Sequence, residues 1–174
     1  MDNNKNKKAV ILMAHGSRVP GAGDAMEKVA CRLSEFLHYD IVETCYMSRL
    51  GPHFEETLKK CVKQGAKTVV LIPYFLNTGL HMRLDIPVKM KKEAERYPEV
   101  KLVFGKNLGF DELLVELVKK RVEESLLLGD VREMDLEPKD SYRLPPGDPE
   151  FVAMSQEEAK RFKAERRNQQ KRGG

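Results

Sequence analysis

The chain has 174 residues and a formal net charge of +4, with 41% hydrophobic and 33% charged residues. This length and composition are typical of a single soluble globular domain with its own hydrophobic core. The longest apolar runs, such as residues 69–73, are too short to cross a bilayer, and the small net charge does not by itself indicate nucleic acid. The polar amino-terminal lead-in, residues 1–8, lacks an apolar signal segment, so we expect a cytoplasmic protein with no membrane partner.

Short apolar runs alternate along the chain with stretches that repeat apolar residues at helical spacing. The runs predict strands over residues 10–13, 41–47, 68–72 and 100–104. The stretches predict helices over residues 24–37, 52–64, 82–96 and 111–126, with Pro52 in a first helical turn and Pro87 either in the first turn of its helix or breaking it. This order predicts an α/β fold: a four-stranded parallel sheet with right-handed crossovers and helices on both faces.

The composition changes after Gly129, so we divide the chain into a folded domain over residues 9–128 and a tail over residues 129–174. Four of the nine prolines lie between residues 137 and 149, and seven basic residues follow from Lys160 onward. A capping-box pattern at residues 155–158 predicts a short helix to about Arg167. We interpret the tail as solvated and partly disordered; an arm that docks on an anionic partner is the alternative.

The three cysteines, Cys31, Cys45 and Cys61, form no C-x-x-C pair and are odd in number. This pattern favours reduced, mostly buried side chains over a disulfide or a zinc site.

Two histidines follow predicted strands. His15 lies in Ala-His-Gly-Ser-Arg after the first strand, and His81 follows the third strand through the turn 77–80. Residues just past the carboxyl ends of parallel strands line the crevice in which such sheets bind ligands. The two imidazoles are therefore candidates to share one metal ion and to accept protons. The alternative is a pair of structural histidines in turns.

The neighbours of these histidines suit an anionic ligand. Arg18 can bind a carboxylate or phosphate through its planar fork, and Arg83 follows His81 closely. Ser17 can cap a helix or contact a ligand oxygen. Asp85 can orient the His81 imidazole by bonding to the ring nitrogen that does not bind the metal. The chain has no P-loop, no G-x-G-x-x-G and no G-x-S-x-G elbow, which disfavours nucleotide binding and a serine hydrolase built on Ser17.

At these residues the chain resembles the class II tetrapyrrole chelatases, specifically the short CbiX-type sirohydrochlorin chelatases. The resemblance covers about residues 8–126 and rests on residues 11–18, on residues 64–67, and on the segment from Ile72 to Pro87. H-G-S-R followed by G-x-H-x-x-x-D-I-P is a specific combination, whereas either motif alone is not.

The resemblance implies a chelatase-like half-domain that inserts a divalent ion into sirohydrochlorin, a tetrapyrrole with eight carboxylates, for cobalamin or sirohaem synthesis. Co²⁺ is the expected metal and Fe²⁺ or Ni²⁺ the alternatives, as substrate, with no tightly bound cofactor. His15 and His81 carry over as the pair that binds metal and accepts protons. The loop from Leu76 to His81 (Leu76, Asn77, Thr78, Gly79, Leu80) carries over as the macrocycle-binding loop, with Arg18 and Arg83 for the carboxylates. Short members pair as homodimers.

One departure from the family pattern concerns the segment after the second strand. The family commonly has E-x-x-E-P, whereas this chain has Ser48-Arg49-Leu50-Gly51-Pro52 and lacks both carboxylates. His53, which follows directly, is a tentative third metal ligand, with a surface or capping histidine as the alternative. The missing carboxylates also favour a second hypothesis for the whole chain, a non-catalytic carrier or sensor of a metal or tetrapyrrole.

Overall fold

The computed structural model describes residues 6–17, 19, 21–36, 39–48 and 51–136. It divides the chain into two units, Met1–Met134 and Asp135–Gly174, and nearly all described residues belong to the first. The predicted helix over residues 155–167 lies outside the described residues. None of the described helices is both long and apolar enough to cross a membrane.

Four strands and four helices alternate in the first unit. The elements are β1 (Lys7–Ala14), α1 (Asp24–Phe36), β2 (Ile41–Tyr46), α2 (Phe54–Lys63), β3 (Ala66–Pro73), α3 (Ile86–Arg96), β4 (Lys101–Phe104) and α4 (Glu112–Ser125). A single π-helical turn, His81–Asp85, leads into α3, and a short 3₁₀ turn, Val131–Glu133, follows α4.

The sheet is parallel throughout, with strand order β2-β1-β3-β4, which confirms the predicted fold class. β1 and β3 are its central strands, and Met13 pairs with Cys45 of β2 and with Pro73 of β3. Chain connections leave β1 and β3 toward opposite edges, because β2 lies outside β1 and β4 lies outside β3. This arrangement opens a crevice at the carboxyl ends of β1 and β3.

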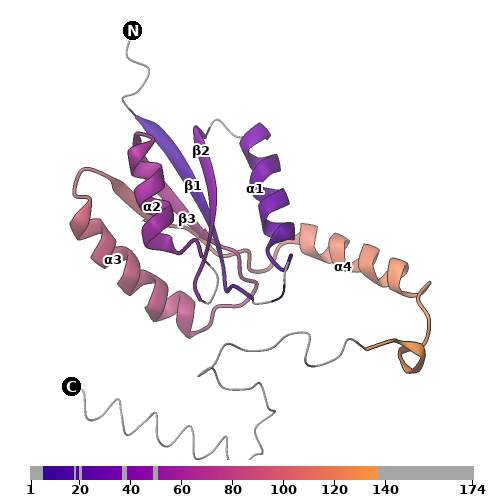
Figure 1. Cartoon of the computed structure of the whole chain (residues 1–174). Coiled ribbons are helices and arrows are strands. Elements are labelled where there is room, and N and C mark those ends of the chain that lie inside the picture. Colours follow the sequence, from indigo (N-terminus) through magenta and orange to yellow (C-terminus); the bar gives the residue numbers. More distant parts are fainter. Residues whose placement is uncertain (1–5, 18, 20, 37–38, 49–50, 137–174) are drawn as a thin grey trace, which may run out of the picture. The chain divides into compact units, whose positions relative to one another are not determined.

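The alternation of side chains along β1 builds two hydrophobic cores. Ala9, Ile11 and Met13 point to the face covered by α2 and α3, where Phe54 and Leu58 are fully buried. Val10 and Leu12 point to the opposite face, which α1 covers (Figure 1). A continuous run of buried apolar residues, 9–13, is typical of a strand enclosed between helices on both faces.

Several element boundaries differ from the predictions. β1 begins at Lys7, inside the expected polar lead-in, because its backbone pairs with β3 whatever the side chain is. Pro52 lies two residues before α2 rather than in its first turn, and His53 is the residue that caps the helix. Pro87 does lie in the first turn of α3, where no helical hydrogen bond needs its missing N–H group.

The cysteines follow the prediction only in part. All three are free, and Cys45 and Cys61 are buried, but Cys31 is exposed on α1. Burial raises the pKa of Cys45 and of Cys61 to about 12, so both thiols stay protonated at neutral pH.

Helix α4 differs from the other three helices because none of its residues is buried. Its first turn is capped by Asp111, whose carboxylate accepts a hydrogen bond from the Leu113 N–H group at 2.9 Å. Leu113 is 79% exposed and Val122 53% exposed. The helix therefore forms with its apolar side chains uncovered.

Candidate functional site

His15 is the first residue after β1, and two features of the backbone fix its position. Gly16 has a φ of +94°, and a side chain there would collide with the carbonyl group of Ser48. The carbonyl oxygen of His15 accepts hydrogen bonds from the N–H group and the hydroxyl of Ser48, each at 3.0 Å. The segments that follow β1 and β2 are therefore joined directly at His15.

His81 is the first residue of the π-helical turn that precedes α3. Its Nδ1 lies 2.6 Å from Oδ2 of Asp85, so the carboxylate accepts a hydrogen bond from the imidazole. With the Nδ1 proton engaged in this way, the lone pair of the neutral ring is on Nε2, the atom left available for a metal or a proton. This contact matches the orienting role predicted for Asp85.

The structure brings the two imidazoles together from the ends of β1 and β3. Their ring centroids are 5.5 Å apart, with an angle of 56° between the ring planes. Both rings line a cavity of about 530 Å³. Its other lining residues are Met47, Ser48, Leu84, Asp85, Val88 and Lys89. The cavity thus combines two nitrogen donors with apolar walls, which suits a flat ligand with a hydrophobic body and polar edges.

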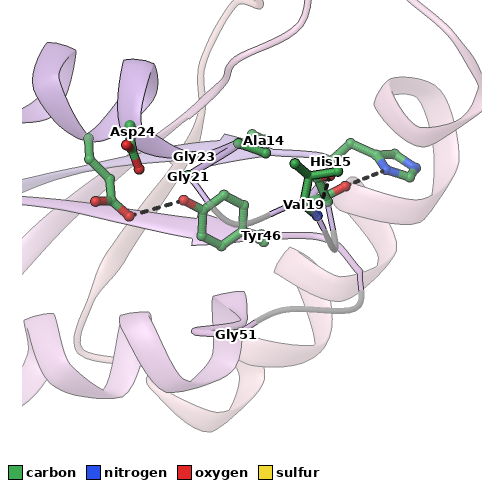
Figure 2. A pocket seen from close by; sticks show the side chains of 12 residues that line it. Ala14, His15, Val19, Gly21, Gly23, Asp24, Tyr46 and Gly51 are labelled. Carbon is green, nitrogen blue, oxygen red and sulfur yellow. Dashed lines mark hydrogen bonds between the residues drawn. The ribbon is translucent and has the colours of Figure 1, made fainter. Parts of the chain in front are cut away.

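A second cavity, of about 370 Å³, lies next to His15 between β1, β2 and the start of α1, and Ser17 is among its lining residues. The Tyr46 hydroxyl donates a hydrogen bond to Glu27 there at 3.2 Å. Burial, and this bond to a carboxylate, raise the pKa of Tyr46. His15 lines both cavities, and its imidazole extends away from Tyr46 (Figure 2).

Among the described residues, Ser17, Arg83 and the loop 76–80 do not line the cavity that holds the histidine pair. Arg18 is not among the described residues. Ser17 does not cap α1, which begins seven residues later; its hydroxyl accepts a hydrogen bond from the Val19 N–H group at 3.1 Å. Arg83 is exposed and lines neither cavity, and the same holds for Leu76, Asn77, Thr78, Gly79 and Leu80.

The exposed loop beside His81 is held at its base by a residue that sequence reasoning missed. The side-chain amide of Asn107 donates hydrogen bonds to the carbonyl oxygens of Phe75 and Leu76, at 3.1 and 3.2 Å. Above this anchor the loop is open, and a Cβ atom on Gly79 would meet nothing within 4 Å. No local signal marks Asn107, because its partners are more than 30 residues away in the chain.

The structure does not place His53 in the cavity that holds the His15–His81 pair. Its Nδ1 lies 3.1 Å from the carbonyl oxygen of Tyr46, and its N–H group donates to the Glu56 carboxylate at 3.1 Å. It lines neither cavity. Within the part of the chain that the structure describes, no group of three His, Cys, Asp or Glu side chains could hold a metal ion. The alternative prediction, a capping histidine, is confirmed because His53 is the N-cap of α2.

Comparisons with known proteins agree with this geometry. The CbiX family model matches residues 9–125. Sirohydrochlorin ferrochelatase of Priestia megaterium is 33% identical over 67% of this chain and 44% of its own length. Sirohydrochlorin cobaltochelatase of Methanopyrus kandleri is 30% identical over 68% of this chain and 96% of its own length. The crystal structure of the sirohydrochlorin chelatase SirB from Bacillus subtilis subspecies spizizenii, in complex with cobalt, superposes with a TM-score of 0.64 at 30% identity, covering 68% of this chain and 50% of that one.

The fold and the paired histidines thus define a chelatase-like α/β protein. The chain belongs to the CbiX family, as the match over residues 9–125 shows. It spans less than half the length of some curated relatives, such as the two from Priestia megaterium, at 44% and 38%.

Proposed function

We propose that this chain inserts a divalent metal ion into sirohydrochlorin. The observation that carries the proposal is the His15–His81 pair, with ring centroids 5.5 Å apart in one cavity at the ends of β1 and β3. Relatives named sirohydrochlorin ferrochelatase and sirohydrochlorin cobaltochelatase support the substrate and the reaction. Co²⁺ is the metal we expect, with Fe²⁺ and Ni²⁺ as alternatives.

The chemistry needs a metal carrier and a proton acceptor at the same place. A divalent ion that enters the macrocycle replaces two pyrrole N–H protons, so two protons must leave for each ion inserted. Neutral imidazoles can hold the incoming cation and then accept the departing protons. The Asp85 carboxylate, 2.6 Å from Nδ1 of His81, stabilises the imidazolium that forms.

Substrate recognition follows from the surroundings of the pair. We propose that the macrocycle lies against the loop Leu76–Leu80 and over the apolar wall of the cavity, while Arg18 and Arg83 attract its carboxylates. Ser17 supports the turn that follows His15, since its hydroxyl accepts the Val19 N–H group at 3.1 Å. Cations near the crevice would steer a polyanion toward it, an effect that weakens as salt is added. The cytoplasmic location expected from the sequence stays a prediction.

The direct test follows the absorbance of sirohydrochlorin with purified protein and Co²⁺, Fe²⁺ or Ni²⁺ in turn. We expect the spectral change of metalation to be faster than the spontaneous reaction with at least one metal. A rate equal to the spontaneous rate for all three metals, with the macrocycle bound, would support the second candidate, a carrier or sensor. That candidate is favoured by one observation: the described residues provide two histidines but no third acidic, cysteine or histidine ligand.

We also propose that two copies of the chain form a homodimer through α4. The side chains Val70 and Ile72 of β3 and Val103 of β4, on the α1 side of the sheet, are only half-buried, whereas Val69 and Leu71 on the other face are buried. Helix α4 carries apolar side chains that nothing in its own unit buries. The α4 helix of one copy can therefore cover the open strip of sheet on the other.

The lengths of two relatives support a second copy of this chain as the partner of α4. The chain matches 44% of the Priestia megaterium ferrochelatase but 96% of the Methanopyrus kandleri cobaltochelatase, so the same unit occurs in proteins of two sizes. The test is sedimentation of the wild type and of Val118→Lys/Val122→Lys, with Glu116→Lys as the control on the same helix. We expect dimers for the wild type and the control and monomers for the double variant; a monomeric wild type contradicts the homodimer.

A further inference from the structure

The cavity that holds the histidine pair contains a cation that the sequence motifs do not mark. Lys89 lines it together with His15, His81 and Asp85. It lies four residues after Asp85 and eight after His81, so the three side chains recur at the spacing that places residues on one side of a helix. Lys89 is half-buried, in contrast to Lys91 and Lys92 on the same helix, which are exposed.

The charges around Lys89 leave its ammonium group available. The Asp85 carboxylate in the same cavity bonds to His81 at 2.6 Å. Among the described residues, no carboxylate oxygen forms an ion pair with Lys89 within 4.0 Å. The positive charge of Lys89 acts on the Cys45 thiol of β2. There it partly opposes the effect of burial, which raises the pKa of Cys45. A half-buried cation with no carboxylate partner in the described part of the chain favours an anionic ligand.

The apolar residues of the cavity show how such a ligand would lie. Met47, Leu84 and Val88 form its hydrophobic wall, next to the two imidazoles. A flat macrocycle seated on this wall with its centre over the histidines would extend its peripheral groups toward α3. Lys89 stands on that helix at the edge of the same cavity.

We propose that Lys89 binds a peripheral carboxylate of the tetrapyrrole and so fixes the position of the macrocycle over the histidine pair. This inference rests on the proposed function and adds a substrate-positioning residue to it. Lys89 takes no part in proton transfer or metal binding. Its loss should therefore weaken macrocycle binding and leave the rate at saturating macrocycle nearly unchanged.

The experiment measures the equilibrium Kd of metal-free sirohydrochlorin, by the change in its absorbance or fluorescence, for the wild type and for Lys89→Met. Lys92→Met is the matched control, because it removes the same charge from an exposed position on the same helix. We expect Kd to rise about tenfold for Lys89→Met, to stay within about twofold for Lys92→Met, and to be largely restored by Lys89→Arg. The slope of Kd against salt concentration should also be smaller for Lys89→Met.

The outcomes separate this inference from the proposed function. Equal Kd values for the wild type and Lys89→Met would overturn the role of Lys89 and leave the proposed metal insertion intact. A fall in kcat at saturating macrocycle with an unchanged Kd would also overturn it, since a positioning role acts on binding. Absence of macrocycle binding by the wild type would overturn the proposed function and this inference with it. If Lys89→Met lowers the melting temperature, Lys89→Gln provides the same test.

Discussion

The histidine site and helix α4 differ in how far contacts within the chain hold their side chains in place. At the site, Ser48 holds the backbone of His15 with two hydrogen bonds of 3.0 Å, and Asp85 holds the ring of His81 at 2.6 Å. In α4 no side chain is buried, and Leu113 and Val118 are 79% and 59% exposed. The first region is organised by contacts within its own chain, whereas the second exposes apolar side chains, which is the basis of the proposed dimer interface.

The largest effect should come from removing either imidazole. We expect His15→Ala and His81→Ala each to lower the rate of metal insertion at least 100-fold, because each removes a metal ligand and a proton acceptor. Both side chains are exposed, so the melting temperature should change little. Near-normal turnover in both variants, in an absorbance assay with Co²⁺, would rule out the assigned roles.

The fold that places these histidines was largely predictable, because it depends on short-range patterns. Apolar runs at β1 and β3 and helical spacing in α1 and α2 are visible in the sequence, and the order of the elements then predicts a parallel sheet. The proximity of His15 and His81 follows from β1 and β3 being neighbours at the centre of that sheet.

The parts that were missed depend on tertiary contacts or on exact boundaries. Asn107 bonds to partners more than 30 residues away in the sequence, and the cavity that Lys89 lines is completed by His15, Met47 and Ser48 from distant parts of the chain. The motif could not show where His53 lies: its Nδ1 contacts the Tyr46 carbonyl group at the start of α2, and it does not line the cavity of the histidine pair. The sequence could not show that the apolar side chains of α4 are uncovered, because their pattern is the same whether another copy or the helix's own sheet covers them.

Stability measurements would sharpen the contrast between the core and α4. Leu58→Ala removes a fully buried side chain and should lower the free energy of unfolding by about 2–5 kcal/mol at every protein concentration. Leu117→Ala, on α4, should lower the melting temperature only at concentrations where the wild type is dimeric. The check is thermal unfolding at two protein concentrations; a concentration-independent loss for Leu117→Ala would show that α4 packs within its own copy.

A smaller effect on activity is expected at Asp85. Asp85→Asn keeps the size of the side chain but removes the charge that orients His81 and stabilises its protonated form. We expect metal insertion to slow about 10- to 100-fold, with the macrocycle Kd unchanged. Steady-state rates and macrocycle binding are compared in one preparation; an unaltered rate would mean that the 2.6 Å contact has no catalytic effect.

The smallest expected effect is a difference in reactivity between the exposed and the buried cysteine thiols. Because burial raises the pKa of Cys45 and Cys61 to about 12, only about one in 10,000 of either thiol is ionised at pH 8. Exposed Cys31 should therefore react with a thiol reagent first and alone in the native protein, and all three should react after denaturation. Rapid labelling of a second thiol in native protein would contradict the burial of the core around β2 and α2.

The most direct test of the central claim is a crystal structure of the protein soaked with Co²⁺, phased on the cobalt signal. The account predicts one cobalt ion bound by a ring nitrogen of His15 and by Nε2 of His81, in the cavity that both imidazoles line. Cobalt bound to one of these histidines alone, or to neither, at saturating metal would contradict it.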